Sequence, residues 1–146
     1  MNANSHWKSI KTRYRVSSKY RMQLELNFTE YLVGKCRLTA ASTDEIKTQK
    51  ISLSNDGIVF SDTIPLSWFT SSLLIPWAKI RMMAVSDKLP VIDGVSHTPR
   101  ASNLNRQTVD FEYCSIGLSD PLEATIDLPW SKEFTNTVQR KKLFDI

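Results

Sequence analysis

Glycine and histidine are scarce in this chain, and their scarcity excludes several kinds of catalytic site. Only 4 of the 146 residues are glycine, and they form neither a P-loop nor a dinucleotide-binding loop. The two histidines, His6 and His97, stand in no recognisable motif, and no G-x-S-x-G elbow occurs. Nucleophilic catalysis needs a base beside the nucleophile. We therefore expect a protein that is not an enzyme.

Cysteine is also rare, with Cys36 and Cys114 as the only two. A pair of thiols in a chain without signs of export predicts reduced, structural cysteines and no disulfide framework. A zinc site built from these thiols and the histidines would match no known spacing of zinc ligands. Asp110 and Glu112 alternate with aromatic residues, which predicts a solvent-facing position and no acid–base pair. We expect no cofactor and no metal.

Long apolar runs are absent as well. No run approaches the roughly 20 residues of a membrane-spanning helix, and the opening "MNANSHWKSIK" lacks the apolar segment of a secretory signal. An apolar share of 41% and a charged share of 23% are ordinary for a globular domain. We expect a single domain over residues 1–146, located in the cytoplasm.

Acidic residues are missing from the first 21 positions, which hold much of the net charge of +4. The basic residues there are Lys8, Lys11, Arg13, Arg15, Lys19 and Arg21. Such a segment attracts anionic surfaces through a field that salt weakens. The candidates for anion or lipid binding, at the inner membrane surface, are Lys8, Lys11, Arg13 and Arg15. The alternative is a solvated basic face that favours solubility.

The first element predicted is an amphipathic helix over about residues 5–15. Trp7, Ile10 and Tyr14 follow helical spacing, Ser5 suits the N-cap, and the basic residues occupy the other face. We expect the three apolar side chains to pack on the domain in preference to a membrane interface. Residues 19–33 fit a strand and a helix equally well, so both remain open.

Short strands dominate the middle of the sequence. The runs 35–42 and 48–55 predict two paired strands, separated by the polar "TDEIK". The "NDG" at residues 55–57 predicts a tight hairpin because these residues tolerate positive φ angles. The strand "GIVFS" follows.

"LLIPWAKI", residues 73–80, contains a proline inside an apolar run. Proline donates no backbone hydrogen bond, which predicts a sheet edge, a bulge or a strand start at Pro76. We expect residues 77–83 to form the strand, with Trp77 in the core and its indole N–H bonded to one partner. Ile80, Met82 and Ala84 alternate there with Arg81 and Met83.

The rest of the chain predicts a loop, two strands and a helix. Residues 86–107 are rich in proline and polar residues and predict a long mobile loop. Residues 108–118 and 122–129 read as a final pair of strands. Trp130, Phe134 and Val138 recur every four residues and predict a helix over about 130–143, with Pro129 at its start. The fold expected is mainly β, a strongly bent antiparallel sheet or partly open barrel of six or seven strands, with a C-terminal helix covering one opening.

This order of elements resembles the pleckstrin-homology-like fold, in particular its GRAM-like and small bacterial versions. A group of short bacterial proteins shares the pattern "HPPL-IPW-x-x-I" together with an N-terminal tryptophan helix. The matching positions are Trp7, Tyr14, Gly57, Pro76, Trp77 and Ile80. Thr70, Ser71 and Ser72 stand where "HPP" would be. The resemblance bears on fold, because fold alone does not imply function.

The resemblance implies binding of phosphoinositides, other anionic groups or peptides, through basic loops or the groove beside the C-terminal helix. Our first hypothesis is a non-enzymatic binding or scaffolding module that contacts anionic lipid or a protein partner. The alternative is a small barrel that holds a ligand, or an enzymatic site, in its interior. Nucleic-acid binding is disfavoured, because only the N-terminal segment mixes basic and aromatic residues. The sequence leaves the oligomeric state open.

Overall fold

The computed structural model describes residues 5–16, 31–62, 72–87, 91–92, 95–96, 99–101 and 111–146. Helices α1 (His6–Tyr14) and α3 (Lys132–Lys141) stand near the two ends of the chain. The longer strands between them are β1 (Leu32–Ala40), β2 (Thr43–Leu53), β3 (Gly57–Ser61), β4 (Ser72–Pro76), β5 (Met82–Ser86), β9 (Phe111–Leu118) and β10 (Ala124–Ser131). This content confirms the mainly β class and both expected helices.

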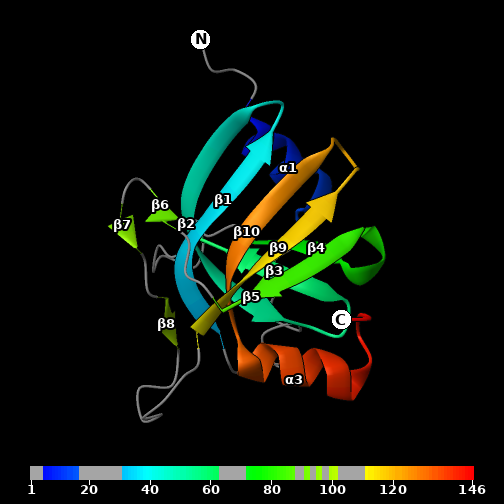
Figure 1. Ribbon diagram of the computed structural model, residues 1–146. Helices are drawn as coiled ribbons and strands as arrows, with labels where there is room; N and C mark the ends of the chain where they lie inside the picture. Colours follow the sequence, from blue (N-terminus) through cyan, green and yellow to red (C-terminus); the bar gives the residue numbers. More distant parts are fainter. Residues whose placement is uncertain are drawn as a thin grey trace.

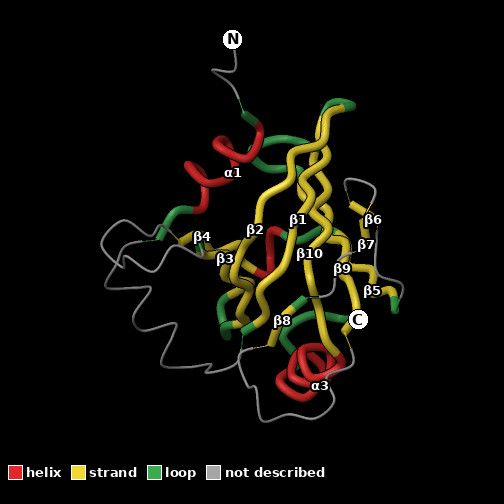
Figure 2. Tube along the Cα trace, turned by 90° about the vertical axis from the view of Figure 1, so that its left-hand side faces the viewer, coloured by secondary structure: helices red, strands yellow, loops and turns green. Residues whose placement is uncertain are grey.

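One curled sheet organises the protein. Within the described ranges, seven strands follow one antiparallel path in the order β4-β3-β2-β1-β10-β9-β5. The path bends into a half-barrel, with α1 and α3 at opposite ends of it (Figures 1 and 2). β4 and β5 are therefore the two edges of the path.

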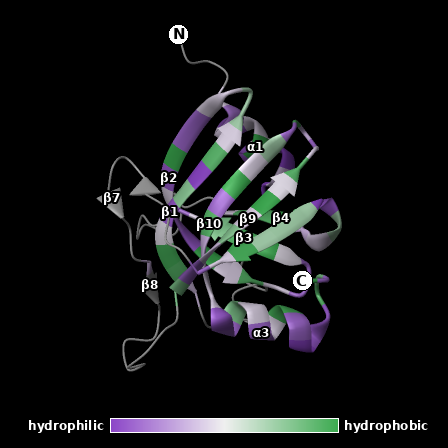
Figure 3. Ribbon diagram, in the orientation of Figure 1, coloured by the Kyte–Doolittle hydropathy of each residue, from purple (hydrophilic) through white to green (hydrophobic). Residues whose placement is uncertain are grey.

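The core lies on the inner face of this half-barrel. Alternate residues of β1, β9 and β10 point inward, and hydropathy alternates along these strands in Figure 3. The inward side chains of these three strands are Cys36, Leu38, Ala40, Cys114, Ile116, Leu118, Ile126, Leu128 and Trp130. Full burial of a large apolar side chain stabilises by about 1.5–3 kcal/mol. Side chains of both helices join the same cluster.

Both helices begin where a serine caps them. The Ser5 hydroxyl accepts a hydrogen bond from the Lys8 N–H at 3.2 Å, and α1 buries the expected Trp7, Ile10 and Tyr14 against the sheet. Packing of this helix on the domain is thus confirmed. For α3 the capping hydroxyl belongs to Ser131, which accepts from the Phe134 N–H at 3.1 Å.

The C-terminal helix starts later than the sequence indicated. The expected start near residue 130, with Pro129 in the first turn, was wrong, because Pro129 and Trp130 are the last paired residues of β10 before Ser131. Trp130 is fully buried, and its indole N–H donates to the Thr135 hydroxyl at 2.8 Å. Trp130 fits the four-residue spacing of the helix and also the two-residue alternation of β10, so its spacing alone could not assign it to one of them.

The first hairpin turn was also misplaced. The segment "TDEIK", expected to be a connection, belongs to β2, and the turn consists of Ala41 and Ser42 with φ angles of 49° and 67°. Its polar character reflects the exposed end of a long hairpin. The "NDG" hairpin is confirmed, but the Ser54 hydroxyl shapes it by accepting from the Asp56 and Gly57 N–H groups at 3.0 and 3.1 Å. Asn55 and Asp56 do not adopt positive φ angles.

The "LLIPWAKI" segment is built in the reverse order to our expectation. Residues 72–76 form the edge strand β4, with Pro76 at its end, and Trp77 opens the 3-10 turn η1 (Trp77–Lys79). The core role of Trp77 is confirmed, and its indole N–H donates to the Ser54 carbonyl at 3.1 Å. Because η1 resets the alternation, Met83 and Val85 face the core while Met82 and Ala84 are exposed.

The structure describes parts of the predicted loop 86–107 and the last residues of the ambiguous stretch 19–33. Within the predicted loop 86–107, β6 (Val91–Ile92) pairs with β7 (Val95–Ser96), and β8 (Arg100–Ala101) pairs with the start of β1. The mobility of this loop stays a prediction. Residues 19–30 lie outside the described ranges, and β1 begins at Leu32.

The two strand carboxylates have different outcomes. Asp110 lies outside the described residues. Glu112 is half-buried and shares the strand phase of the buried Cys114, so its expected solvent-facing position was wrong. The prediction assumed that Tyr113 faces the core and that its neighbours face solvent. Tyr113 is buried, but on the outer face of the sheet.

Candidate functional site

The four basic residues predicted to bind anions lie at α1 but do not form one cluster. Lys8, Lys11 and Arg13 belong to the helix, and Arg15 follows it directly. The Lys11 ammonium lies 3.8 Å from the Asp62 carboxylate, and the Arg13 guanidinium lies 3.1 Å from the Asp120 carboxylate. Lys8 and Arg15 are exposed. Two of the four candidates are therefore paired with acids of the sheet, while Lys19 and Arg21 lie outside the described residues.

The acidic partners of these residues stand in turns of the sheet. Asp120, in the turn after β9, also binds the Lys79 ammonium at 3.3 Å, and its backbone carbonyl accepts from the Tyr14 hydroxyl. Hydrogen bonds from Arg13 and Lys79 hold the pKa of Asp120 below its ordinary value. Asp62, after β3, binds the Lys47 ammonium at 3.6 Å. These acids offset part of the positive field expected along the helix.

Glu45 fixes the N-terminus of α1 from the β1–β2 hairpin. Its carboxylate accepts from the His6 N–H at 2.8 Å, the Trp7 N–H at 3.2 Å and the Ser5 hydroxyl at 2.6 Å. Burial alone would raise the pKa of Glu45, but these hydrogen bonds outweigh it and lower the pKa. A carboxylate at a helix N-terminus also complements the helix dipole. Glu45 is therefore a structural residue in a segment that the sequence had assigned to a connection.

The two thiols are structural, as expected. Cys36 and Cys114 are free and fully buried in the core. Burial, and then the nearby Asp127 carboxylate, raise the pKa of both groups, that of Cys114 to about 12. Both thiols are therefore protonated at neutral pH, and a protonated thiol is a poor nucleophile and a poor metal ligand.

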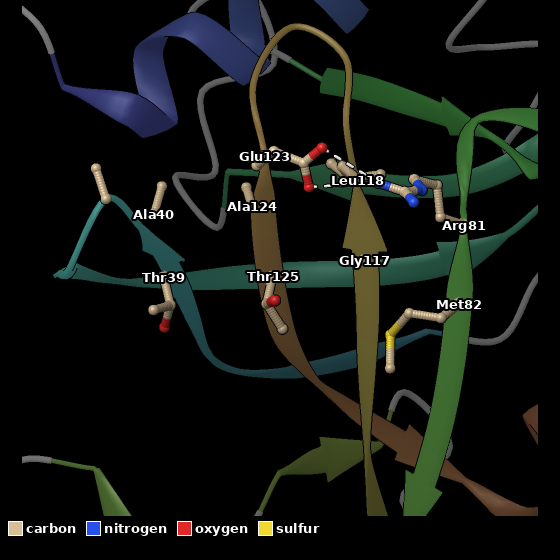
Figure 4. A pocket seen from close by; sticks show the side chains of 10 residues that line it. Thr39, Ala40, Arg81, Met82, Gly117, Leu118, Glu123, Ala124 and Thr125 are labelled. Atoms are coloured by element: carbon tan, nitrogen blue, oxygen red, sulfur yellow. Dashed lines mark hydrogen bonds and ion pairs between the residues drawn. The ribbon is translucent and has the colours of Figure 1, made fainter.

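A groove crosses the outer face of four strands at the end remote from α3. Its volume is about 460 Å³. Thr39 of β1, Thr125 of β10, Gly117 of β9 and Met82 of β5 stand in register and form a row across the sheet. Ala40, Leu118 and Ala124, whose side chains belong to the core, also line the groove (Figure 4), as does the turn residue Ala41. We call this feature the outer groove.

The missing side chain at Gly117 leaves room for the side chain of Met82 on the floor of the outer groove. A Cβ atom there would lie 2.7 Å from the Met82 Cγ atom, because the methionine side chain leans over the glycine (Figure 4). Met82 is nevertheless 47% exposed, an unusual value for a large apolar residue. Arg81 and Glu123 pair at 3.2 Å on the rim. The charged groups of the groove thus balance.

The next row on the same face is closed by its own contacts. The Arg37 guanidinium donates to the Asp127 carboxylate at 2.8 and 3.0 Å, and the Ser115 hydroxyl donates to the other oxygen of that carboxylate. Both oxygens of Asp127 are therefore engaged. The outer groove ends against this polar row.

Sequence reasoning had named two residues of the outer groove, Arg81 and Met82, and both only as positions in an expected strand. One signal was readable, because an isolated glycine inside a strand indicates a close approach of another group. The depth of the groove was not readable, since it depends on which strands lie beside β9. The order β1-β10-β9-β5 joins segments that are far apart in sequence.

Metal binding and membrane crossing have no support among the described residues. No group of three or more histidine, cysteine or acidic side chains there has the geometry to hold a metal ion. Among the same residues, no helix is long and apolar enough to cross a membrane. His97 lies outside the described residues. Comparison of the chain with family models, with curated proteins and with solved structures finds no match, so the pleckstrin-homology-like resemblance stays a prediction.

Proposed function

We propose that this chain is a non-enzymatic binding module that recognises an uncharged segment of a partner protein in the outer groove. The observation that carries this proposal is the exposed Met82 beside a floor of threonine and glycine. A solvent-exposed methionine is adaptable, and such residues are common on surfaces that bind proteins. The groove volume, about 460 Å³, is in the range of known ligand sites.

The charges of the outer groove favour an uncharged occupant. Arg81 is already matched by Glu123, so the rim offers no net positive charge to a phosphate or a carboxylate. The exposed Met82 and the methyl groups of the two threonines suit one or two aliphatic side chains of an extended segment. Binding of peptides is among the functions that the resemblance implies. The groove, however, lies at the opposite end of β10 from α3, not beside that helix.

The inner face of the sheet offers less support for the alternative of an interior ligand or enzymatic site. Large side chains from strands and helices fill it, among them Trp130, Phe60 and Ile10. The buried thiols are protonated, as their raised pKa values require. A filled interior and unreactive thiols support a binding role on the surface.

A peptide selection tests this proposal directly. Random peptides displayed on phage are selected on the protein, and the enriched sequences are synthesised and measured by fluorescence anisotropy. Thr125→Trp fills the outer groove, and Thr48→Trp places the same side chain on exposed β2 outside it. We expect the selected peptides to lose at least tenfold in affinity for T125W and to keep their affinity for T48W. Failure to enrich any peptide, or equal binding to both variants, would overturn the proposal.

A second candidate function is contact with an anionic membrane at the inner surface of the cell. It is favoured by the exposure of Lys8 and Arg15 at one end of the molecule. Because Lys11 and Arg13 are ion-paired within the fold, the informative variant is Lys8→Gln with Arg15→Gln. We expect co-sedimentation with vesicles of phosphatidylglycerol, weakened by salt and by this variant but not by Arg140→Gln with Lys141→Gln on α3. No binding to anionic vesicles at low salt would exclude this candidate.

A further inference from the structure

The row of residues on the floor of the outer groove continues past the groove to an acidic residue. Thr39 of β1, which lines the groove, pairs with Asp44 of β2, so both side chains lie on the outer face of the sheet. The Thr39 hydroxyl donates a hydrogen bond to the Asp44 carboxylate at 2.9 Å. Asp44 is exposed, and none of the described residues forms an ion pair with it. An oriented carboxylate therefore stands directly beyond one end of the groove.

The other charges beside the groove are matched in pairs. On its rim, Arg81 pairs with Glu123 at 3.2 Å. In the neighbouring row, Arg37 binds the Asp127 carboxylate through two hydrogen bonds. Asp44 therefore leaves one unmatched negative charge at the groove, although the whole chain carries a net charge of +4. A group of opposite charge on a partner is attracted to that place.

The same two ion pairs set the direction in which an occupant lies. They close the groove along the strands, so an extended occupant crosses the strands, along the row from Met82 to Thr39. Gly117 and Asp44 are three strands apart in this row, a distance of about 14 Å at a strand spacing of about 4.8 Å. An extended segment advances about 3.3 Å per residue, and alternate side chains point to the same side. Two side chains four positions apart therefore reach Gly117 and Asp44 together.

We infer that the outer groove selects a partner segment in which a lysine or arginine lies four positions from an aliphatic residue. The inference rests on the proposed function of the groove and specifies the partner. The aliphatic side chain packs on Met82 beside Gly117, and the residue midway between the two lies over Thr125 and is uncharged. The basic group lies outside the groove and pairs with the Asp44 carboxylate. The part of the segment inside the groove thus stays uncharged, and the charge at its end fixes the register.

Phage selection on the full chain with matched peptide libraries tests the inference. Each library carries four randomised uncharged residues next to one fixed residue, which is lysine, glutamine or glutamate. The fixed residue stands last in one set of libraries and first in another, since an extended segment can cross the sheet in either direction. We expect enrichment from a lysine library, with an aliphatic residue four positions from the lysine. Replacement of that lysine by glutamine should weaken binding about threefold to fivefold at low salt, as for an exposed ion pair.

Variants of Asp44 assign the charge to one residue. Asp44→Asn removes the charge but keeps an acceptor for the Thr39 hydroxyl, and Asp145→Asn, at an exposed position beyond α3, makes the same change in net charge as a control. In fluorescence anisotropy, D44N should weaken the lysine peptide about threefold to fivefold and leave its glutamine analogue unchanged. D145N should change neither. Asp44→Lys should reverse the preference, so that the glutamate analogue binds more tightly than the lysine peptide.

The possible failures of these experiments are distinguishable. Selected peptides that lose affinity for T125W but bind the original protein and D44N equally would overturn the inference and leave the proposed function of the groove intact. The same holds if the glutamine or glutamate libraries enrich as well as the lysine libraries. If no library yields a peptide that binds, the proposed function and the inference both fall.

Discussion

The two edge strands of the curled sheet differ in how deeply they are buried. β4 is buried along its length, ends at Pro76, and is covered by the chain that leaves α1, where Arg15 bridges to Leu73 and the Val16 N–H donates to the Ser72 carbonyl at 3.1 Å. β5 alternates between exposed and half-buried residues, and β9 is its paired neighbour. The β4 edge is therefore packed into the fold along its length, whereas every second residue of β5 faces solvent.

This difference shows what the N-terminal helix contributes. Its apolar side chains pack into the core near β3, where the Trp7 and Phe60 rings meet edge to face with centroids 6.0 Å apart. That packing brings Arg15 and Val16 to the β4 edge. The sequence predicts that this basic segment contacts an anionic surface. In the structure, its last residues pair with the edge strand β4. Its charge is partly matched by Asp62 and Asp120.

The largest expected effect is a difference in the free energy of unfolding between a core substitution near β4 and one on β5. Phe60→Ala, beside β4, removes a fully buried ring and should lower the free energy of unfolding by about 3–5 kcal/mol. Met83→Ala, on β5, removes a half-buried side chain and should lower it by about 1 kcal/mol. Urea denaturation followed by tryptophan fluorescence measures both. Equal losses would show that the two edges are packed alike.

Two glycines, each paired with a residue of one edge strand, give the second test. Gly57 pairs with Pro76 of β4, and a Cβ there would lie 2.1 Å from the Ile75 carbonyl oxygen. Gly117 pairs with Met82 of β5, and its Cβ would meet only the flexible methionine side chain. G57A should therefore destabilise by about 3 kcal/mol, and G117A by less than about 1 kcal/mol. Denaturant midpoints measure the difference, and a reversed order would contradict this account of the two edges.

Acid should weaken the attachment of the N-terminus of α1 to the sheet. The folded-state pKa of Glu45 is lowered, so its hydrogen bonds to α1 stabilise the fold above the ordinary value of 4.5, and this contribution is lost as pH falls through the lower folded pKa. Glu45→Gln should reduce the free energy of unfolding at pH 7 and flatten its decline toward pH 3. Denaturation curves across this range measure both effects. An unchanged pH profile in E45Q would show that other carboxylates control acid stability.

The smallest expected effect concerns the ion pair on the rim of the outer groove, next to β5. The Arg81–Glu123 pair is exposed on both sides, so a double-mutant cycle with Arg81→Gln and Glu123→Gln should give a coupling energy below about 0.5 kcal/mol. Coupling above about 1 kcal/mol would contradict the expectation that a pair this exposed contributes little to the free energy of unfolding.

The fold was readable from the sequence where local signals agreed. The Ser5 cap with Trp7, Ile10 and Tyr14 specified α1, and "GIVFS" specified β3 to the residue. Failures occurred where one signal served two structures. Trp130 fits the period of the following helix although it belongs to β10, and the polar "TDEIK" is the exposed end of a strand. A left-handed turn at Ala41 and Ser42 carries no glycine or asparagine to announce it.

The candidate site was less readable than the fold. Composition marked Lys8, Lys11, Arg13 and Arg15, but composition contains no information on Asp62 and Asp120, which bind two of them across the fold. The outer groove depends on strand order, which local sequence patterns do not encode. The 3-10 turn before β5 breaks the alternation that begins at Ile80, so Met82 is exposed although Ile80 is buried.

Backbone amide exchange compares the two edge strands in a single experiment. The account predicts stronger protection for the amides of β4, which is buried and bridged by the chain that leaves α1, than for those of β5, whose residues alternate between exposed and half-buried. Equal protection in the two strands, or stronger protection in β5, would contradict the claim that the N-terminal segment stabilises the β4 edge.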